Sequence, residues 1–126
     1  MDPKQLNGVS LSFIGDAVYS VYIREHLLNK GLNSGKKLQE ASKCYVSASG
    51  QSKAFDHLFK NGILNAEELE VYKKGRNAVN HIPKNGKLNT YLKASGLEAL
   101  IGYLYLNDKM RLDEIMQAIL KEVSYE

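Results

Sequence analysis

Apolar residues recur along this chain three and four positions apart, and no segment alternates apolar and polar residues as a strand does. The pattern predicts an all-α fold. We expect helices at about Leu11–Leu28, Gly35–Lys43, Ser47–Asn61, Asn65–Val79, Asn89–Leu106 and Leu112–Val123. Asn65 with Glu68 forms a capping-box pattern at the start of the fourth helix, and Gly31 and Gly62 would end the first and third. Residues 80–86 are expected to form a loop.

The first and fifth predicted helices are the most apolar, and we expect both to be largely buried. Each nevertheless holds one carboxylate near its centre, Asp16 in the first and Glu98 in the fifth. Glycine and alanine residues flank both acids, and such small residues would let the two helices approach closely. The pattern therefore raises the question of what stabilises a carboxylate in an apolar setting.

A buried carboxylate is costly unless it has a partner, a proton or a metal ion. If Asp16 and Glu98 face each other, they repel, and a divalent cation such as Mg²⁺ would relieve that repulsion and could polarise a phosphate. The plainer interpretation is that each acid lies at a helix surface or caps another group. A single acid would favour that interpretation; two acids in the two most apolar helices leave both open.

Length and composition indicate one soluble domain, residues 1–126, with enough apolar residues for a core. The single cysteine, Cys44, excludes an internal disulfide, suits a reducing compartment, and is expected in the core. No signal-peptide core or membrane span is recognisable, so we expect a cytoplasmic protein without a membrane role. The three histidines are scattered, which argues against a zinc site.

The net charge of +3 is modest, but its distribution is uneven. No acid occurs between Glu70 and Glu98, and the same stretch carries Lys73, Lys74, Arg76, Lys84, Lys87 and Lys93. Such a segment is either an ordinary solvated surface or a surface for a polyanion. Its asparagines add neutral donors of the kind that suit duplex RNA, which is recognised through phosphates and 2′-hydroxyls.

Three motifs resemble the ribonuclease III family, and they follow one another along the chain in the order found in that family. FIGDA at residues 13–17 resembles the end of the family signature, and EALIGYLYL at residues 98–106 resembles its second motif. Between them, KKGRNA at residues 73–78 and PKN at residues 83–85 resemble the Mini-III subfamily, which lacks a separate RNA-binding domain. The resemblance spans about residues 6–120.

The resemblance implies a helical homodimer that cleaves double-stranded RNA and leaves a 5′-phosphate. Asp16 and Glu98 would be the catalytic metal ligands for Mg²⁺, with Mn²⁺ as an alternative. The RNA substrate would be the precursor of 23S ribosomal RNA. The RNA-binding residues would be Lys73, Lys74, Arg76, Asn77, Lys84, Asn85 and Lys87.

This chain also departs from the larger members of the family. They carry acids at the positions that match Val9, Ser12 and Ser95, where this chain has none. Mini-III members share this reduced set of acids. Ser12 and Ser95 are therefore secondary candidates that could hydrogen-bond a metal-bound water. The reduced acid set supports an alternative function, a catalytically weak or inactive RNA-binding dimer. A helical protein–protein module with no RNA role is a third hypothesis, supported only by the helical composition.

Overall fold

The computed structural model describes residues 1–79 and 87–122, and within them the regular elements are all helical, as predicted. Each predicted helix is present, with its ends within three residues of the prediction. The elements are η1 (Pro3–Gln5), α1 (Gly8–Asn29), α2 (Gly35–Val46), α3 (Ala48–Lys60), α4 (Ala66–Asn77), α5 (Leu88–Asn107) and α6 (Lys109–Glu122).

Side-chain caps explain why several helices begin where they do. The Asn7 side chain accepts a hydrogen bond from the Ser10 N–H, so α1 starts three residues earlier than its apolar pattern suggests. The predicted capping box is confirmed, because Asn65 and Glu68 each accept a bond from the other's backbone N–H. Gly31 has a positive φ of 89°, which ends the first helix as expected.

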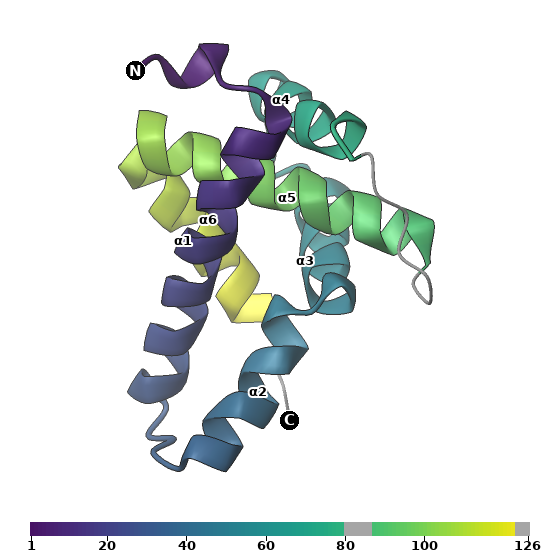
Figure 1. Cartoon of the computed structure of the whole chain (residues 1–126). Coiled ribbons are helices and arrows are strands. Elements are labelled where there is room, and N and C mark those ends of the chain that lie inside the picture. The colour runs from purple at the N-terminus through teal and green to yellow at the C-terminus, as the bar shows by residue number, and fades with distance from the viewer. Residues whose placement is uncertain (80–86, 123–126) are drawn as a thin grey trace.

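Helix α5 is the centre of the fold and contacts α1, α3, α4 and α6. Figure 1 shows α5 running across the molecule, with α1 crossing it and α4 lying along its upper edge. Most of the α5 side chains from Ala94 to Leu104 are buried, which confirms the prediction that this helix lies inside.

Glycines allow α1 and α5 to touch backbone to backbone. A Cβ atom on Gly15 would overlap the carbonyl oxygen of Glu98, and one on Gly102 would overlap the carbonyl oxygen of Leu11. Close packing leaves no room for either methyl group without moving a helix. The same contact fixes Asp16, which follows Gly15, relative to Glu98.

Helix α4 is held in place by a charged contact with α6. The Arg111 Nε donates to the Glu68 Oε2 at 2.7 Å, and its Nη2 donates to the Ile63 carbonyl oxygen at 2.7 Å. Burial raises the pKa of Glu68, but hydrogen bonds from Arg111 and the Asn65 N–H hold it below its ordinary value. The carboxylate is therefore ionised and ties the start of α4 to α6.

Two expectations about burial are wrong. Helix α1 is not largely buried, because Val9, Phe13 and Val21 are exposed and the Phe13 side chain is 83% accessible. Asp16 is exposed as well, so its surroundings are less apolar than the neighbouring sequence indicated. Cys44 is also exposed, because it points away from the buried side of α2 that carries Ala41 and Tyr45. Apolar periodicity identifies a helix but does not show how much of its surface other elements cover.

Candidate active site

Asp16 and Glu98 lie at the crossing of α1 and α5, in the wall of one open pocket of about 450 Å³. Ser12 and Ser95 line the same pocket, so the structure brings together the two proposed ligands and both secondary candidates. The C-terminal end of α4, around Gly75 and residues 78–79, forms the remaining wall. The pocket thus depends on the packing of three helices.

Glu98 is a partly buried carboxyl group whose surroundings disfavour its charged form. Its burial, together with a hydrogen bond and charge repulsion from Asp16, raises its pKa from 4.5 to about 8. A pair of carboxyl groups in contact holds one proton readily, and a divalent cation could take the place of that proton. The exposed Asp16 and the partly buried Glu98 therefore form an asymmetric acidic pair.

Sequence reasoning missed Gln51, a side chain on α3 that contacts Glu98 of the acidic pair. Its Nε2 donates to the Val46 carbonyl oxygen at 3.0 Å and to the Glu98 Oε2 at 3.4 Å. The residue is buried, with 3% of its surface accessible, and its Oε1 has no partner among the described residues. Nothing in the sequence marks this glutamine, because its role follows from the packing of α3 on α5.

The phenol of Tyr19 on α1 is buried, and its hydroxyl has no hydrogen-bond partner in the described part of the chain. Burial first, and then the nearby Tyr45 and Glu98, raise its pKa above the ordinary value. The hydroxyl therefore stays protonated and is a neutral donor close to Glu98.

The two serine candidates lie where α1 meets α5, beside the acidic pair. The Ser12 hydroxyl donates to the Ser95 carbonyl oxygen at 3.0 Å, and this bond links α1 to α5 beside the acids. Its oxygen can still accept one bond or more. Both serine side chains line the pocket, so a water molecule there would have polar neighbours.

These residues fit a hard divalent cation only in part. Two carboxyl groups facing one open pocket are a suitable donor set for Mg²⁺, which keeps several of its waters. Within residues 1–79 and 87–122, however, no group of three or more His, Cys, Asp or Glu side chains is placed to hold a metal. Any cation here would therefore take its other ligands from water or substrate.

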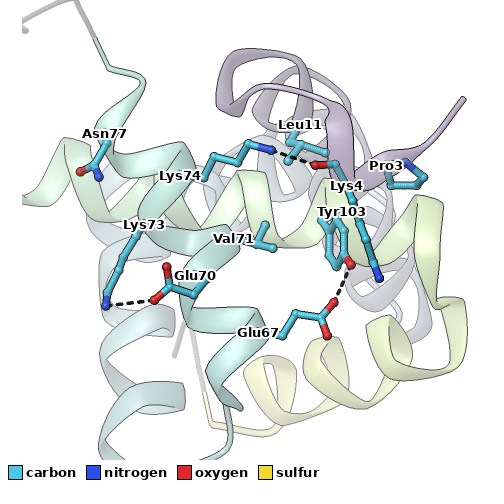
Figure 2. A pocket seen from close by; sticks show the side chains of 10 residues that line it. All are labelled: Pro3, Lys4, Leu11, Glu67, Glu70, Val71, Lys73, Lys74, Asn77 and Tyr103. Carbon is cyan, nitrogen blue, oxygen red and sulfur yellow. Dashed lines mark hydrogen bonds and ion pairs between the residues drawn. The ribbon is translucent and has the colours of Figure 1, made fainter.

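The basic residues of α4 do not line the acidic pocket. Lys73, Lys74 and Asn77 line a second pocket beside the N-terminal segment, shown in Figure 2. There the Lys74 Nζ donates to the Lys4 carbonyl oxygen at 3.3 Å, and Lys73 points the other way, toward Glu70. Arg76 faces a third groove, on the α3 side of α4.

The remaining RNA-binding candidates come between α4 and α5 along the sequence. Lys87 is exposed immediately before α5 begins. Lys84 and Asn85 lie outside the described residues. The structure therefore distributes the predicted RNA-binding residues around α4 rather than on one face.

Known proteins match nearly the whole chain. The model of the ribonuclease III domain matches residues 9–109. A Mini-ribonuclease 3 from Enterococcus faecalis is 40% identical over 97% of this chain and 94% of its own length. Another from Streptococcus pneumoniae is 38% identical over 98% of both chains. The crystal structure of a Fusobacterium nucleatum protein has a TM-score of 0.82 at 28% identity, covering 95% of this chain and 96% of that one.

The helical crossing, its acidic pair and the domain match together define a ribonuclease III domain. The chain belongs to the ribonuclease III family, in its Mini-ribonuclease 3 group. This membership supports an endoribonuclease activity. In the described part of the chain, no helix combines the length and the apolar character that a bilayer span requires.

Proposed function

We propose that this chain is a metal-dependent endoribonuclease that cleaves double-stranded RNA. The observation that carries the proposal is the acidic pair, Asp16 and Glu98, in an open pocket of a chain that belongs to this family. The pair has the charge to hold a divalent cation, and the pocket is open to a large substrate.

Asp16 and Glu98 would hold Mg²⁺, or Mn²⁺ in its place. The bound cation supplies Lewis-acid chemistry, in which a phosphate is polarised and water is activated as a nucleophile. Glu98 has to release its proton before it can act as a ligand, because metal ligands bind in the deprotonated form. Gln51 holds the Glu98 carboxylate in position, and the hydroxyls of Ser12 and Ser95 would orient water.

Duplex RNA would be held outside the pocket by cations and amides on several surfaces. Lys73, Lys74, Arg76 and Asn77 of α4, together with Lys87, are exposed or half-buried and can reach phosphates. A duplex is wide enough to contact residues on more than one side of a helix, so these residues need not share a face. Lys84 and Asn85 would belong to the same surface.

The working unit is proposed to be a homodimer formed through α1. Val9, Phe13, Ala17 and Val21 are exposed and follow one another every four residues, so they form a stripe along one face. An apolar stripe of this kind is typical of a surface that a partner covers. Val9 and Phe13 also line the acidic pocket, so the second copy would lie close to it. Sedimentation showing only monomer at micromolar concentration would contradict this part.

Incubation with a perfectly paired RNA tests the activity. We expect internal cuts with Mg²⁺, fragments with 5′-phosphate ends, and no cuts with a chelator. A single strand of the same sequence is the control for duplex preference. If duplex is bound equally well with and without metal but is never cut, the chain is the RNA-binding dimer without activity that its reduced acid set also supports.

The natural substrate is proposed to be the 23S ribosomal RNA precursor in the cytoplasm, which the resemblance to the Mini-III subfamily implies. Cells that lack the protein should accumulate 23S ribosomal RNA with unprocessed ends. Mapping these ends in cells with and without the gene checks this expectation. Normal ends in the deleted strain would redirect the search to other structured RNAs.

A further inference from the structure

A groove of about 660 Å³ on the α3 side of α4 shares Lys73 and Arg76 with the proposed duplex-binding surface, but its aromatic residues and the rest of its lining have no role in the proposed cleavage. None of its lining residues is shared with the acidic pocket. On α5, Asn89 and Lys93 face the groove, whereas Tyr91, Ser95 and Glu98 face the pocket. The groove and the pocket therefore lie on different sides of α5.

Aromatic rings form one wall of this groove. The rings of Phe55 and Tyr72 stack with their centroids 3.8 Å apart and their planes 3° from parallel. Phe59 continues the stack at 5.8 Å and 22° from Phe55. Phe55 and Tyr72 are buried, but 58% of the Phe59 surface is accessible. The stack therefore presents an exposed aromatic residue, Phe59, at its outer end, packed against the buried ring of Phe55.

Cations surround these rings. The groove is lined by four basic side chains, Lys60, Lys73, Arg76 and Lys93, and by one carboxylate, Asp56. Asp56 forms an ion pair with Lys93, with the Lys93 Nζ 2.9 Å from the Asp56 Oδ1. Arg76 lies 5.9 Å from the centre of the Tyr72 ring. The excess positive charge favours an anionic ligand, and the aromatic wall favours a flat one.

We propose that this aromatic–cationic groove binds an unpaired nucleotide of an RNA strand that extends from a duplex. Its base would stack on Phe59, and its phosphates would lie near Lys60 and Arg76. Aromatic residues beside cations are the usual way in which proteins hold single-stranded nucleic acid, because every base has a face that can stack. The inference rests on the proposed RNA substrate and gives that substrate a further feature, a single-stranded extension.

Binding measured in the presence of a chelator, so that no RNA is cut, tests the groove. Three labelled probes are compared: a blunt duplex, the same duplex with a short single-stranded extension, and that extension with abasic sites in place of its bases. The wild-type chain should bind the extended duplex roughly 5- to 100-fold more tightly than the blunt one. Abasic sites should remove most of this gain, because they keep the phosphates but cannot stack.

Variants of the groove separate stacking from charge. Phe59→Ala should abolish the gain and leave the binding of blunt duplex unchanged, and Phe59→Trp should restore it. Lys60→Ala should weaken the binding of the extended probe and lower its salt dependence. Met110→Ala is the matched control, because Met110 is an exposed apolar residue on α6, outside the groove. It should change none of these affinities.

Several results would overturn the proposal. Equal affinity for blunt and extended duplex, or full affinity for the abasic probe, excludes a base-stacking site. If Phe59→Ala changes binding of a poly-glutamate peptide but not of the extended RNA, the groove binds an acidic protein instead. Binding and cleavage of the blunt duplex test the proposed function independently of the groove. If the chain binds an unpaired strand but neither binds nor cuts a duplex, the proposal for the groove stands and the proposed function is wrong.

Discussion

The crossing of α1 and α5 and the exposed surface of α4 contribute to this molecule in different ways. At the crossing, two glycines allow backbone contact, and the position of each carboxyl group is fixed by its neighbours. On α4, Lys74 and Arg76 line different grooves and Lys73 lines both, and the exposed lysines make only long contacts, 3.3 Å for Lys74 and 3.5 Å for Lys73. A site for chemistry requires fixed distances, whereas attraction of a polyanion requires only charge.

The contrast also predicts how the two regions respond to mutation. Changes at the crossing should act steeply on cleavage or on stability, because the two backbones touch there and the two carboxyl groups are in contact. Each change on α4 should lower RNA affinity only by a small step, because several cations each contribute part of the attraction to phosphate.

The largest effect is expected from Asp16→Asn. The substitution keeps the size of the side chain but removes the charge that would hold the cation. Cleavage should fall by more than roughly a hundredfold, since loss of even an indirect partner of a metal ligand costs about 10- to 100-fold. RNA binding should persist, and the melting temperature measured above about pH 8, where both carboxyl groups are otherwise ionised, should stay the same or rise because repulsion with Glu98 is relieved. Rates and melting temperature are measured on the same samples.

Two further variants complete this test. Glu98→Gln should behave like Asp16→Asn, and the double variant should lose little more than either single one, because both serve one site. Asp113→Asn removes an exposed carboxylate from α6 and should leave cleavage intact. An Asp16→Asn protein that melts early but still cuts would refute the metal-site assignment.

The second largest effect is expected from Gly15→Ala. Its new Cβ would overlap the Glu98 carbonyl oxygen, so α1 and α5 would have to move apart. Overpacking of this kind typically costs about 1–3 kcal/mol and occasionally more. Gly35→Ala is the matched control, because its Cβ would meet nothing within 4 Å at the start of α2. Urea denaturation of both variants measures the difference. Equal stability would mean that the crossing is looser than backbone contact implies.

A more gradual effect concerns how the stability of the metal-free protein depends on pH. Glu98 has a raised pKa of about 8 against an ordinary 4.5, so between these values the folded chain holds a proton that the unfolded chain has released. Its contribution to stability is therefore complete below about pH 4.5 and is lost as pH rises to about 8. The slope is at most about 1.4 kcal/mol per pH unit for one group. Urea titrations with a chelator should show this decline in the wild type and a flatter profile in Glu98→Gln.

Sequence patterns identified the helices and the capping box because each depends on residues close together along the chain, and each acid of the pair was marked by the apolar helix and the family motif around it. They failed where long-range packing decides. The exposure of Phe13 depends on which elements cover α1, and the contact of Gln51 with Glu98 depends on how α3 meets α5. The family resemblance located Asp16 and Glu98 but not the side chain that holds one of them in place.

Gln51→Leu tests that missed contact. The Gln51 amide lowers the pKa of Glu98, so its removal should raise that pKa further and shift the rise of cleavage rate with pH to higher values. Saturating metal should offset part of the loss, because the cation competes with the proton. A rate profile from about pH 6 to 9 measures the shift. A uniform loss of rate without a shift would instead indicate a merely structural role.

The smallest effects are expected on α4, where charge is shared. Lys74→Ala and Arg76→Ala should each weaken duplex binding modestly, and each lost phosphate contact should lower the log–log salt slope by roughly one. Lys37→Ala on α2 removes an equal charge from another exposed site and serves as the control. Because Lys74 and Arg76 face different grooves, their effects on the slope should add. Unchanged slopes would place both residues off the RNA surface and leave Lys73, Lys84 and Lys87 as the remaining proposed basic contacts.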